Sequence, residues 1–105
     1  MIDSEKVPQL LELTAAISAI LGPQWRLLIE NWEEAAHISW HPDCAPGKYP
    51  VAVDFYSEAS GEGPCKVQVD DSARAAVNPE IREKVNAVVE WARANNVLLG
   101  FEHNA

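Results

Sequence analysis

Hydrophobic residues recur at helical spacing near both ends of this chain and at every second position in between, and this change of period constrains the fold most. A helix places every third or fourth residue on one face, whereas a strand places every second residue there. The sequence therefore predicts two helices that flank a group of strands. Helices packed on one face of such a sheet make an α+β two-layer domain, with an N-terminal helix, an antiparallel three- to four-stranded sheet and a C-terminal helix.

The first helix is predicted over residues 8–21, where large aliphatic side chains repeat at helical spacing before Gly22-Pro23 ends the helix. Leu11 and Ala15 widen its apolar face. We therefore expect this helix to be covered on more than one side.

The second helix is predicted to begin after Asn78, which is a good N-cap, with Pro79 at its first position. Asn95 or Asn96 can adopt the left-handed conformation that ends it. The apolar tail 97–101 must pack back onto the domain, and an edge strand would achieve this. The expected buried stripe comprises Ile81, Val85, Val88 and Ala92, with Val89 beside it.

Residues 24–41 fit two patterns. At period two, Trp25, Leu27 and Ile29 share one face of a first strand, and a second strand follows. At period 3.6, the same segment forms a helical stripe that includes Trp32. We favour two strands here.

The alternation continues further along the chain. It predicts a strand over residues 51–56 and another over 65–70, and the polar, glycine-containing segment between them suggests a hairpin.

The composition predicts one folded domain over residues 1–105, because 48% of the residues are hydrophobic and the net charge is −8. A negative surface repels phosphate groups, so direct binding to nucleic acid or an anionic membrane is disfavoured. No apolar run reaches the ~18–20 residues of a membrane span. The chain begins with acidic rather than basic residues, unlike a secretory signal. We expect a cytoplasmic protein with reduced thiols.

The excess charge is concentrated in residues 30–71, where nine acids face two lysines. Most charge runs are only a solvated face. Here, however, aromatic residues lie among the acids, and this mixture is typical of a surface that docks a basic partner. The predicted partner-binding residues are Glu30, Trp32, Glu33, Glu34, Asp54, Tyr56, Glu58, Asp70 and Asp71.

A metal site is the weaker alternative. Its candidate ligands are His37, His41, Cys44 and Cys65, which are residue types that suit Zn²⁺. Their spacing matches no common zinc pattern, and no Cys-x-x-Cys is present. A Cys44–Cys65 disulfide is the other use of these thiols, but it is disfavoured in a cytosolic chain. We therefore expect neither a metal nor another cofactor.

The sequence contains none of the common phosphate-binding, nucleotide-binding, serine hydrolase or metalloprotease motifs. It therefore favours a small acidic, non-enzymatic binding protein. The most plausible role is an inhibitor or antidote that docks the basic surface of a nuclease or other nucleic-acid-binding protein, as in toxin immunity or phage anti-defence. The alternatives are a small metal-dependent domain or enzyme, or a structural subunit of a homodimer formed through the tail 97–101.

Overall fold

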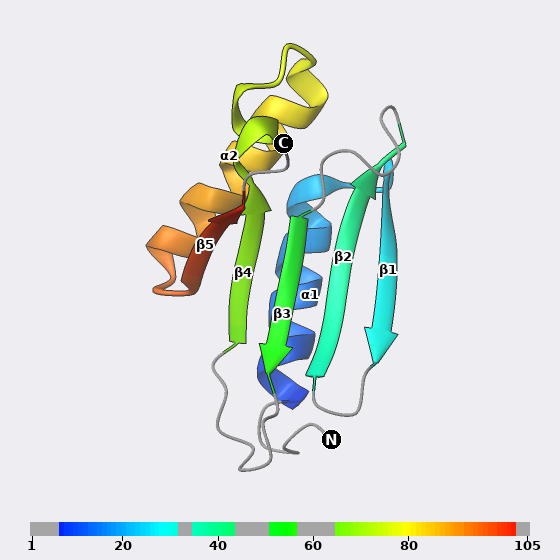
Figure 1. Cartoon of the computed structure of the whole chain (residues 1–105), viewed down its shortest axis with the longest axis vertical. Helices are drawn as coiled ribbons and strands as arrows, with labels where there is room; N and C mark the ends of the chain where they lie inside the picture. Colours follow the sequence, from blue (N-terminus) through cyan, green and yellow to red (C-terminus); the bar gives the residue numbers. More distant parts are fainter. Residues whose placement is uncertain (1–6, 32–34, 44–50, 57–64, 103–105) are drawn as a thin grey trace.

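The structure is a computed structural model that describes residues 7–31, 35–43, 51–56 and 65–102 (Figure 1). The order of its elements agrees with the predicted change of period. In chain order they are α1 (Val7–Leu21), β1 (Trp25–Asn31), β2 (Ala35–Pro42), β3 (Val51–Tyr56), β4 (Cys65–Asp70), the 3₁₀ helix η2 (Asp71–Ala75), α2 (Pro79–Ala94) and β5 (Leu98–Glu102).

The strands form one five-stranded sheet in the order β1-β2-β3-β4-β5. The strands β1 to β4 pair antiparallel in sequence order, whereas β5 pairs parallel with β4. The expected sheet of three to four antiparallel strands is therefore corrected to a mixed sheet of five. The predicted tail does form an edge strand. It runs parallel to β4 because η2 and α2 carry the chain back to the starting end of that strand.

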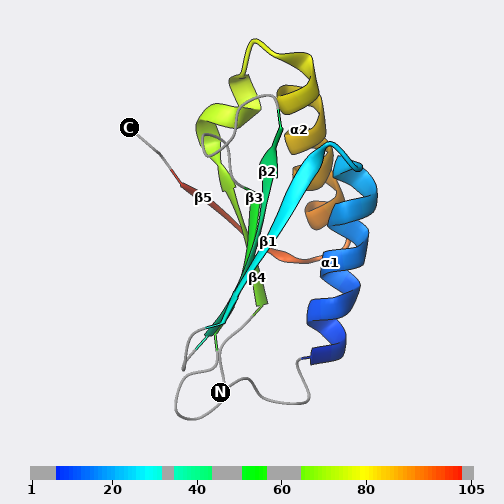
Figure 2. The same ribbon diagram turned by 90° about the vertical axis from the view of Figure 1, so that its right-hand side faces the viewer.

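Both helices pack on the same face of the sheet and leave the other face without a helix (Figure 2). This is the predicted two-layer α+β arrangement. The core fills the space between sheet and helices, and each large aliphatic side chain buried there contributes about 1.5–3 kcal/mol. Its most deeply buried members are Ile17, Leu21, Trp40, Val51, Val53, Val67, Val69, Val85, Val88 and Val89.

The second helix, α2, confirms its predicted limits and its predicted buried stripe. The side chain of Asn78 accepts a hydrogen bond from the backbone N–H of Glu80 at 2.9 Å and so caps the first turn. At the other end, Asn96 adopts a φ of 56°, the left-handed conformation that terminates many helices. All five residues predicted for the stripe are buried.

The first helix, α1, is covered less than the sequence suggested. Leu13, Ile17 and Leu21 are buried, but Leu11 is 63% exposed and Ala15 is also exposed. The expectation of cover on more than one side is wrong for this part of the helix. A two-layer domain offers a helix one sheet to pack against, so the flank of α1 that carries Leu11 and Ala15 is left exposed.

Residues 25–31 and 35–42 form strands, so the helical alternative for this segment is wrong. The antiparallel pairing of β1 with β2 satisfies their backbone groups. Trp40 is 1% exposed, and its indole N–H donates to the hydroxyl of Ser18 at 3.0 Å, which joins β2 to α1.

Burial along β1 falls off steeply. Trp25 is 5% exposed, whereas Leu27 and Ile29 on the same strand face are 41% and 57% exposed. The helix α1 lies behind β2 and β3 and α2 lies on the side of β4 and β5, so this edge strand is left largely uncovered (Figure 1).

Candidate functional site

The face of the sheet that α1 and α2 leave uncovered, here called the open face, carries the candidate residues of the strands except Cys65. Ile38 and Trp40 of β2 are buried on the helix-covered face, so the alternating positions 37, 39 and 41 belong to the open face. One row of register positions crosses four strands there. In order from β1 to β4 it consists of Glu30, His37, Asp54 and Lys66.

Strand direction brings three of the five described docking residues, Glu30, Asp54 and Tyr56, to one end of the sheet. The strands β1 and β3 finish at the same end at which β2 and β4 begin, because neighbouring strands run antiparallel. The segments 32–34 and 57–64 connect these strand ends. Among the described residues, Glu30 and Asp54 lie at this end of the sheet, which we call the acidic end because the connecting segments carry Glu33, Glu34, Glu58 and Glu62 in the sequence.

The acidic end also takes in one of the two predicted aromatic residues, Tyr56. Tyr56 is the last residue of β3. Trp32, Glu33, Glu34 and Glu58 lie outside the described residues.

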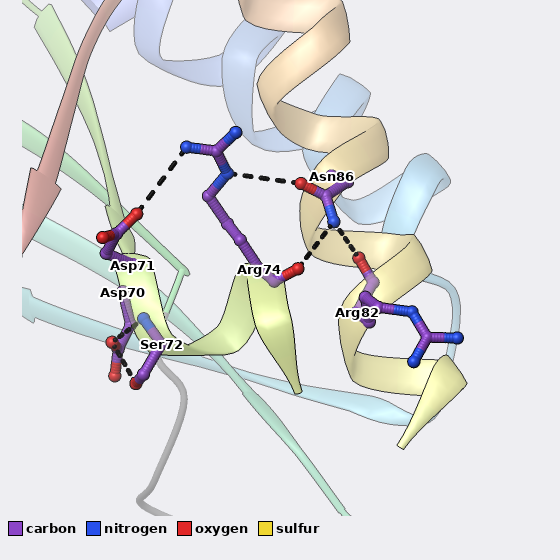
Figure 3. Close-up of polar contacts among 6 residues, drawn as sticks. All are labelled: Asp70, Asp71, Ser72, Arg74, Arg82 and Asn86. Carbon is purple, nitrogen blue, oxygen red and sulfur yellow. Dashed lines mark hydrogen bonds and ion pairs between the residues drawn. The ribbon is translucent and has the colours of Figure 1, made fainter. Parts of the chain in front are cut away.

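Asp70 and Asp71 lie at the opposite end of the sheet, where β4 finishes (Figure 1). Asp70 is 2% exposed, and its Oδ1 accepts hydrogen bonds from the backbone N–H of Ser72 at 3.0 Å and from its hydroxyl at 2.7 Å (Figure 3). Asp71 forms an ion pair with Arg74 at 3.6 Å. These two carboxylates therefore shape η2 and stand apart from the acidic end.

The four candidate metal ligands do not share one face of the sheet. His37 and His41 lie on the open face, four residues apart, which is ~13 Å along a strand. The register position of Cys65 is in line with Val67 and Val69 on the helix-covered face. Zinc requires its ligands within about 2.0–2.3 Å of the ion, so a site with Cys65 and both histidines would have to cross the sheet.

The remaining candidate ligand is Cys44. Cys44, and with it the alternative Cys44–Cys65 disulfide, lies outside the described residues. Within the described ranges, no group of three or more His, Cys, Asp or Glu side chains is arranged to hold a metal ion.

A serine–histidine contact on the open face was not predicted. The hydroxyl of Ser39 lies 3.1 Å from Nε2 of His41, two positions along β2. The period-two alternation of 37, 39 and 41 was the sequence signal that could have suggested it. A nucleophilic serine must be reached by its substrate, but Ser39 is only 3% exposed. This contact therefore serves as a polar link within the sheet surface.

The helix-covered side carries a small hollow between the start of α1 and the end of α2. Its volume is about 240 Å³, which is below the roughly 300–1,000 Å³ of typical small-molecule sites. Its lining mixes apolar and polar side chains: Glu12, Leu13, Trp91, Asn95 and Val97.

Comparison of the chain with protein families, with curated proteins and with solved structures gives no match. None of the helices described here combines the length and the apolar character needed to cross a membrane.

Proposed function

We propose that this chain is a small acidic, non-enzymatic binding protein whose acidic end docks the basic surface of a nucleic-acid-binding protein. The observation that supports the proposal is the strand topology, which brings Glu30 and Asp54 to the same end of the sheet, together with a sequence that carries four further acids in the segments 32–34 and 57–64. Lys66 lies opposite Asp54 in the register and offsets one of these charges. The remaining excess still favours a positively charged partner over a phosphate-rich one.

The mixture of acidic and aromatic residues at the acidic end also fits a protein partner. Carboxylates attract a basic surface before contact and so raise the association rate, whereas aromatic side chains supply much of the energy that holds a complex together. Trp32 and Tyr56 are the aromatic residues that accompany the acids. We infer that the carboxylates steer the partner and that these two rings anchor it.

A catalytic role is supported less well. Ser39 is shielded from solvent, and the hollow between the helices is small. The biological role proposed here is that of an inhibitor or antidote, of the toxin-immunity or phage anti-defence type. This choice rests on analogy, since small acidic proteins that neutralise basic nucleases share its size and charge.

The experiment compares two charge-reversed variants that change the net charge by the same amount. One carries Glu33→Lys and Glu34→Lys at the acidic end. The matched control carries Glu83→Lys and Glu90→Lys on exposed positions of α2. Each tagged protein is used to capture partners from the native host, and the captured proteins are identified and quantified.

The proposal expects that the wild type and the α2 variant retain the same basic protein and that the acidic-end variant loses it. The opposite pattern, with binding lost only in the α2 variant, would place the docking surface on the helix side. Equal retention of the partner by all three proteins would contradict electrostatic docking at either place.

A further inference from the structure

The outer edge of β1 has the properties of a strand that pairs with another strand. It forms one edge of the sheet, and among the described residues no strand lies beyond it. Leu27, Leu28 and Ile29 at its centre are 41%, 45% and 57% exposed, so both faces of the edge are apolar. Edges of monomeric proteins are commonly protected by proline, a bulge or an inward-pointing charge. The seven residues of β1 contain no proline, and their register with β2 is continuous.

The hydrogen bonds next to β1 show which backbone groups point outward. The N–H of Asp43 donates to the carbonyl of Gln24 at 3.0 Å, one residue beyond the opposed positions Trp25 and Pro42. This bond marks Trp25 and Pro42 as a pair that does not exchange hydrogen bonds itself. Bonded and non-bonded pairs alternate along an antiparallel ladder. Leu28 therefore bonds to β2, whereas Leu27 and Ile29 direct their N–H and C=O groups away from it.

We propose that β1 pairs antiparallel with β1 of a second copy of this chain, across a two-fold axis at Leu28. In this register Leu27 lies opposite Ile29 of the partner subunit, and the two residues exchange the backbone hydrogen bonds that point outward. Arg26 lies opposite Glu30 of the partner subunit on the open face. The symmetry repeats each contact. The two sheets then join into one continuous sheet with the helices of both subunits on the same side.

Charge complementarity identifies the occupant as a second copy. A strand that carries Arg26 and Glu30 at equal distances from its centre is complementary to itself when it is reversed. Opposite charges that face each other across two strands are stabilising, and like charges there are destabilising. In a chain of net charge −8, this strand therefore offers a second copy a local surface without net charge.

The exposed side of α1 supports the same arrangement. Ser18 faces β2, since its hydroxyl accepts the hydrogen bond from Trp40. Ala15 and Leu11 lie three and seven positions before it and therefore share its helix face. Leu11 is 63% exposed. Leu11 thus adds exposed apolar surface on the side of α1 that faces β2, the neighbour of β1 in the sheet.

The other edge of the sheet fits a second copy less well. Leu98 and Phe101 of β5 are 49% and 40% exposed. A two-fold axis at Gly100 would oppose Leu98 to Glu102 of the partner subunit, so no pair of opposite charges forms. The ring of Phe101 is also covered on one face by the guanidinium of Arg74, 4.7 Å from its centroid. We therefore assign the dimer contact to β1.

The test measures the dissociation constant of the dimer by sedimentation equilibrium for the wild type and for two single variants, Arg26→Glu and Glu30→Arg. Each variant converts both symmetric pairs into like charges, so its dimer should dissociate about 30-fold more readily. A mixture of the two variants restores opposite charges in both pairs. It should form a heterodimer with nearly the wild-type dissociation constant, which also shows that both variants are folded.

Two further variants separate the strand edges. Ile29→Pro removes an outward N–H without removing a bond to β2, and it should abolish the dimer while thermal unfolding of the monomer stays cooperative. Leu98→Lys on β5 should leave the dimer intact. A wild type that remains monomeric at high concentration would overturn the proposal. So would a dimer that is insensitive to the charge variants, or one that is lost with Leu98→Lys. Glu33 and Glu34 take no part in this contact, so the variant with Glu33→Lys and Glu34→Lys should keep the dimer, and the two proposals can fail separately.

Discussion

Arg74 and Asn86 are joined by two hydrogen bonds that run in opposite directions. The side-chain amide of Asn86 donates to the backbone carbonyl of Arg74 at 3.0 Å, and its oxygen accepts from Nε of Arg74 at 3.3 Å (Figure 3). The same amide donates to the carbonyl of Arg82 at 2.9 Å. One asparagine thus fixes η2 to α2, and Arg74 in turn covers the ring of Phe101 in β5.

Replacing Asn86 should therefore destabilise the fold more than its half-buried position suggests. We expect Asn86→Ala to lower the free energy of unfolding by about 1–3 kcal/mol, because it leaves the carbonyl and guanidinium of Arg74 without this partner. Urea denaturation measures the change. Glu90→Ala, an exposed substitution on the same helix, is the control and should shift stability by no more than about 0.5 kcal/mol. Equal losses for both would contradict the role of Asn86.

The buried stripe of α2 gives a second stability prediction. Ile81 is 2% exposed and Val88 is fully buried. We expect Ile81→Ala or Val88→Ala to cost about 1–4 kcal/mol through lost burial and the cavity that remains. Glu83→Ala on the exposed side of the same helix should have a much smaller effect. Small and equal shifts in the denaturation midpoints of all three would show that the helix does not pack as described.

Replacing two glycines by alanine should change stability by different amounts. Gly22 has a φ of 85°, and its N–H donates to the carbonyl of Ser18 to close α1. A methyl group there meets nothing within 4 Å, yet Gly22→Ala should cost about 1–2 kcal/mol because an L-residue resists this conformation.

Gly100 in β5 has no such conformation. Its added methyl would lie 2.5 Å from Cε of Lys66, which is the end of a flexible side chain and can move away. Gly100→Ala should therefore change stability by no more than about 0.5 kcal/mol. A thermal melt of both variants checks the contrast, and a larger loss at Gly100 than at Gly22 would refute it.

Docking by the acidic end makes a kinetic prediction once the partner is in hand. Steering acts over about one Debye length, ~8 Å at physiological salt, so the association rate should fall as salt is added. Trp32→Ala should instead raise the dissociation rate, because a buried aromatic anchor holds a complex rather than attracting it. Surface plasmon resonance at several salt concentrations separates the two rates. An association rate that is independent of salt would exclude steering.

The metal-site alternative predicts two results that the docking proposal does not. A zinc site built from His37, His41 and the cysteines would leave about one metal ion per purified chain and would make stability sensitive to chelator. We expect neither result, because the histidines and Cys65 belong to opposite faces of the sheet. Metal analysis after dialysis, paired with melts in the presence of a chelator, checks this. A stoichiometric metal would favour the metal-dependent alternative.

Local chemistry made several elements predictable from sequence. Asn78 and Pro79 mark the start of α2, and Gly22 marks the end of α1, because capping and positive φ depend on a few neighbouring residues. The valines of β3 and β4 alternate clearly enough to identify both strands. Trp25 and the residues after it fitted two periods, and strand pairing with β2 decided between them.

Features that depend on distant parts of the chain were not predictable in this way. The parallel pairing of β5 requires the path of α2, and the exposure of Ile29 depends on where α1 crosses the sheet. The candidate site shows the same limit. Asp54 and Asp70 belong to the same acidic stretch of the sequence, residues 30–71. In the antiparallel sheet they lie at opposite ends.

The late position of β5 in the chain has a consequence for synthesis. Among the described strands, the outer edge of β4 has β5 as its partner, and β5 is translated only after η2 and α2. At cellular elongation rates this delay is on the order of seconds. During that time, the part of the nascent chain that has left the ribosome presents unpaired edges on both β1 and β4. The valines of β4 also remain uncovered until α2 packs against them. Chaperones have their best opportunity to bind at this stage, and slower translation of residues 71–97 would prolong it.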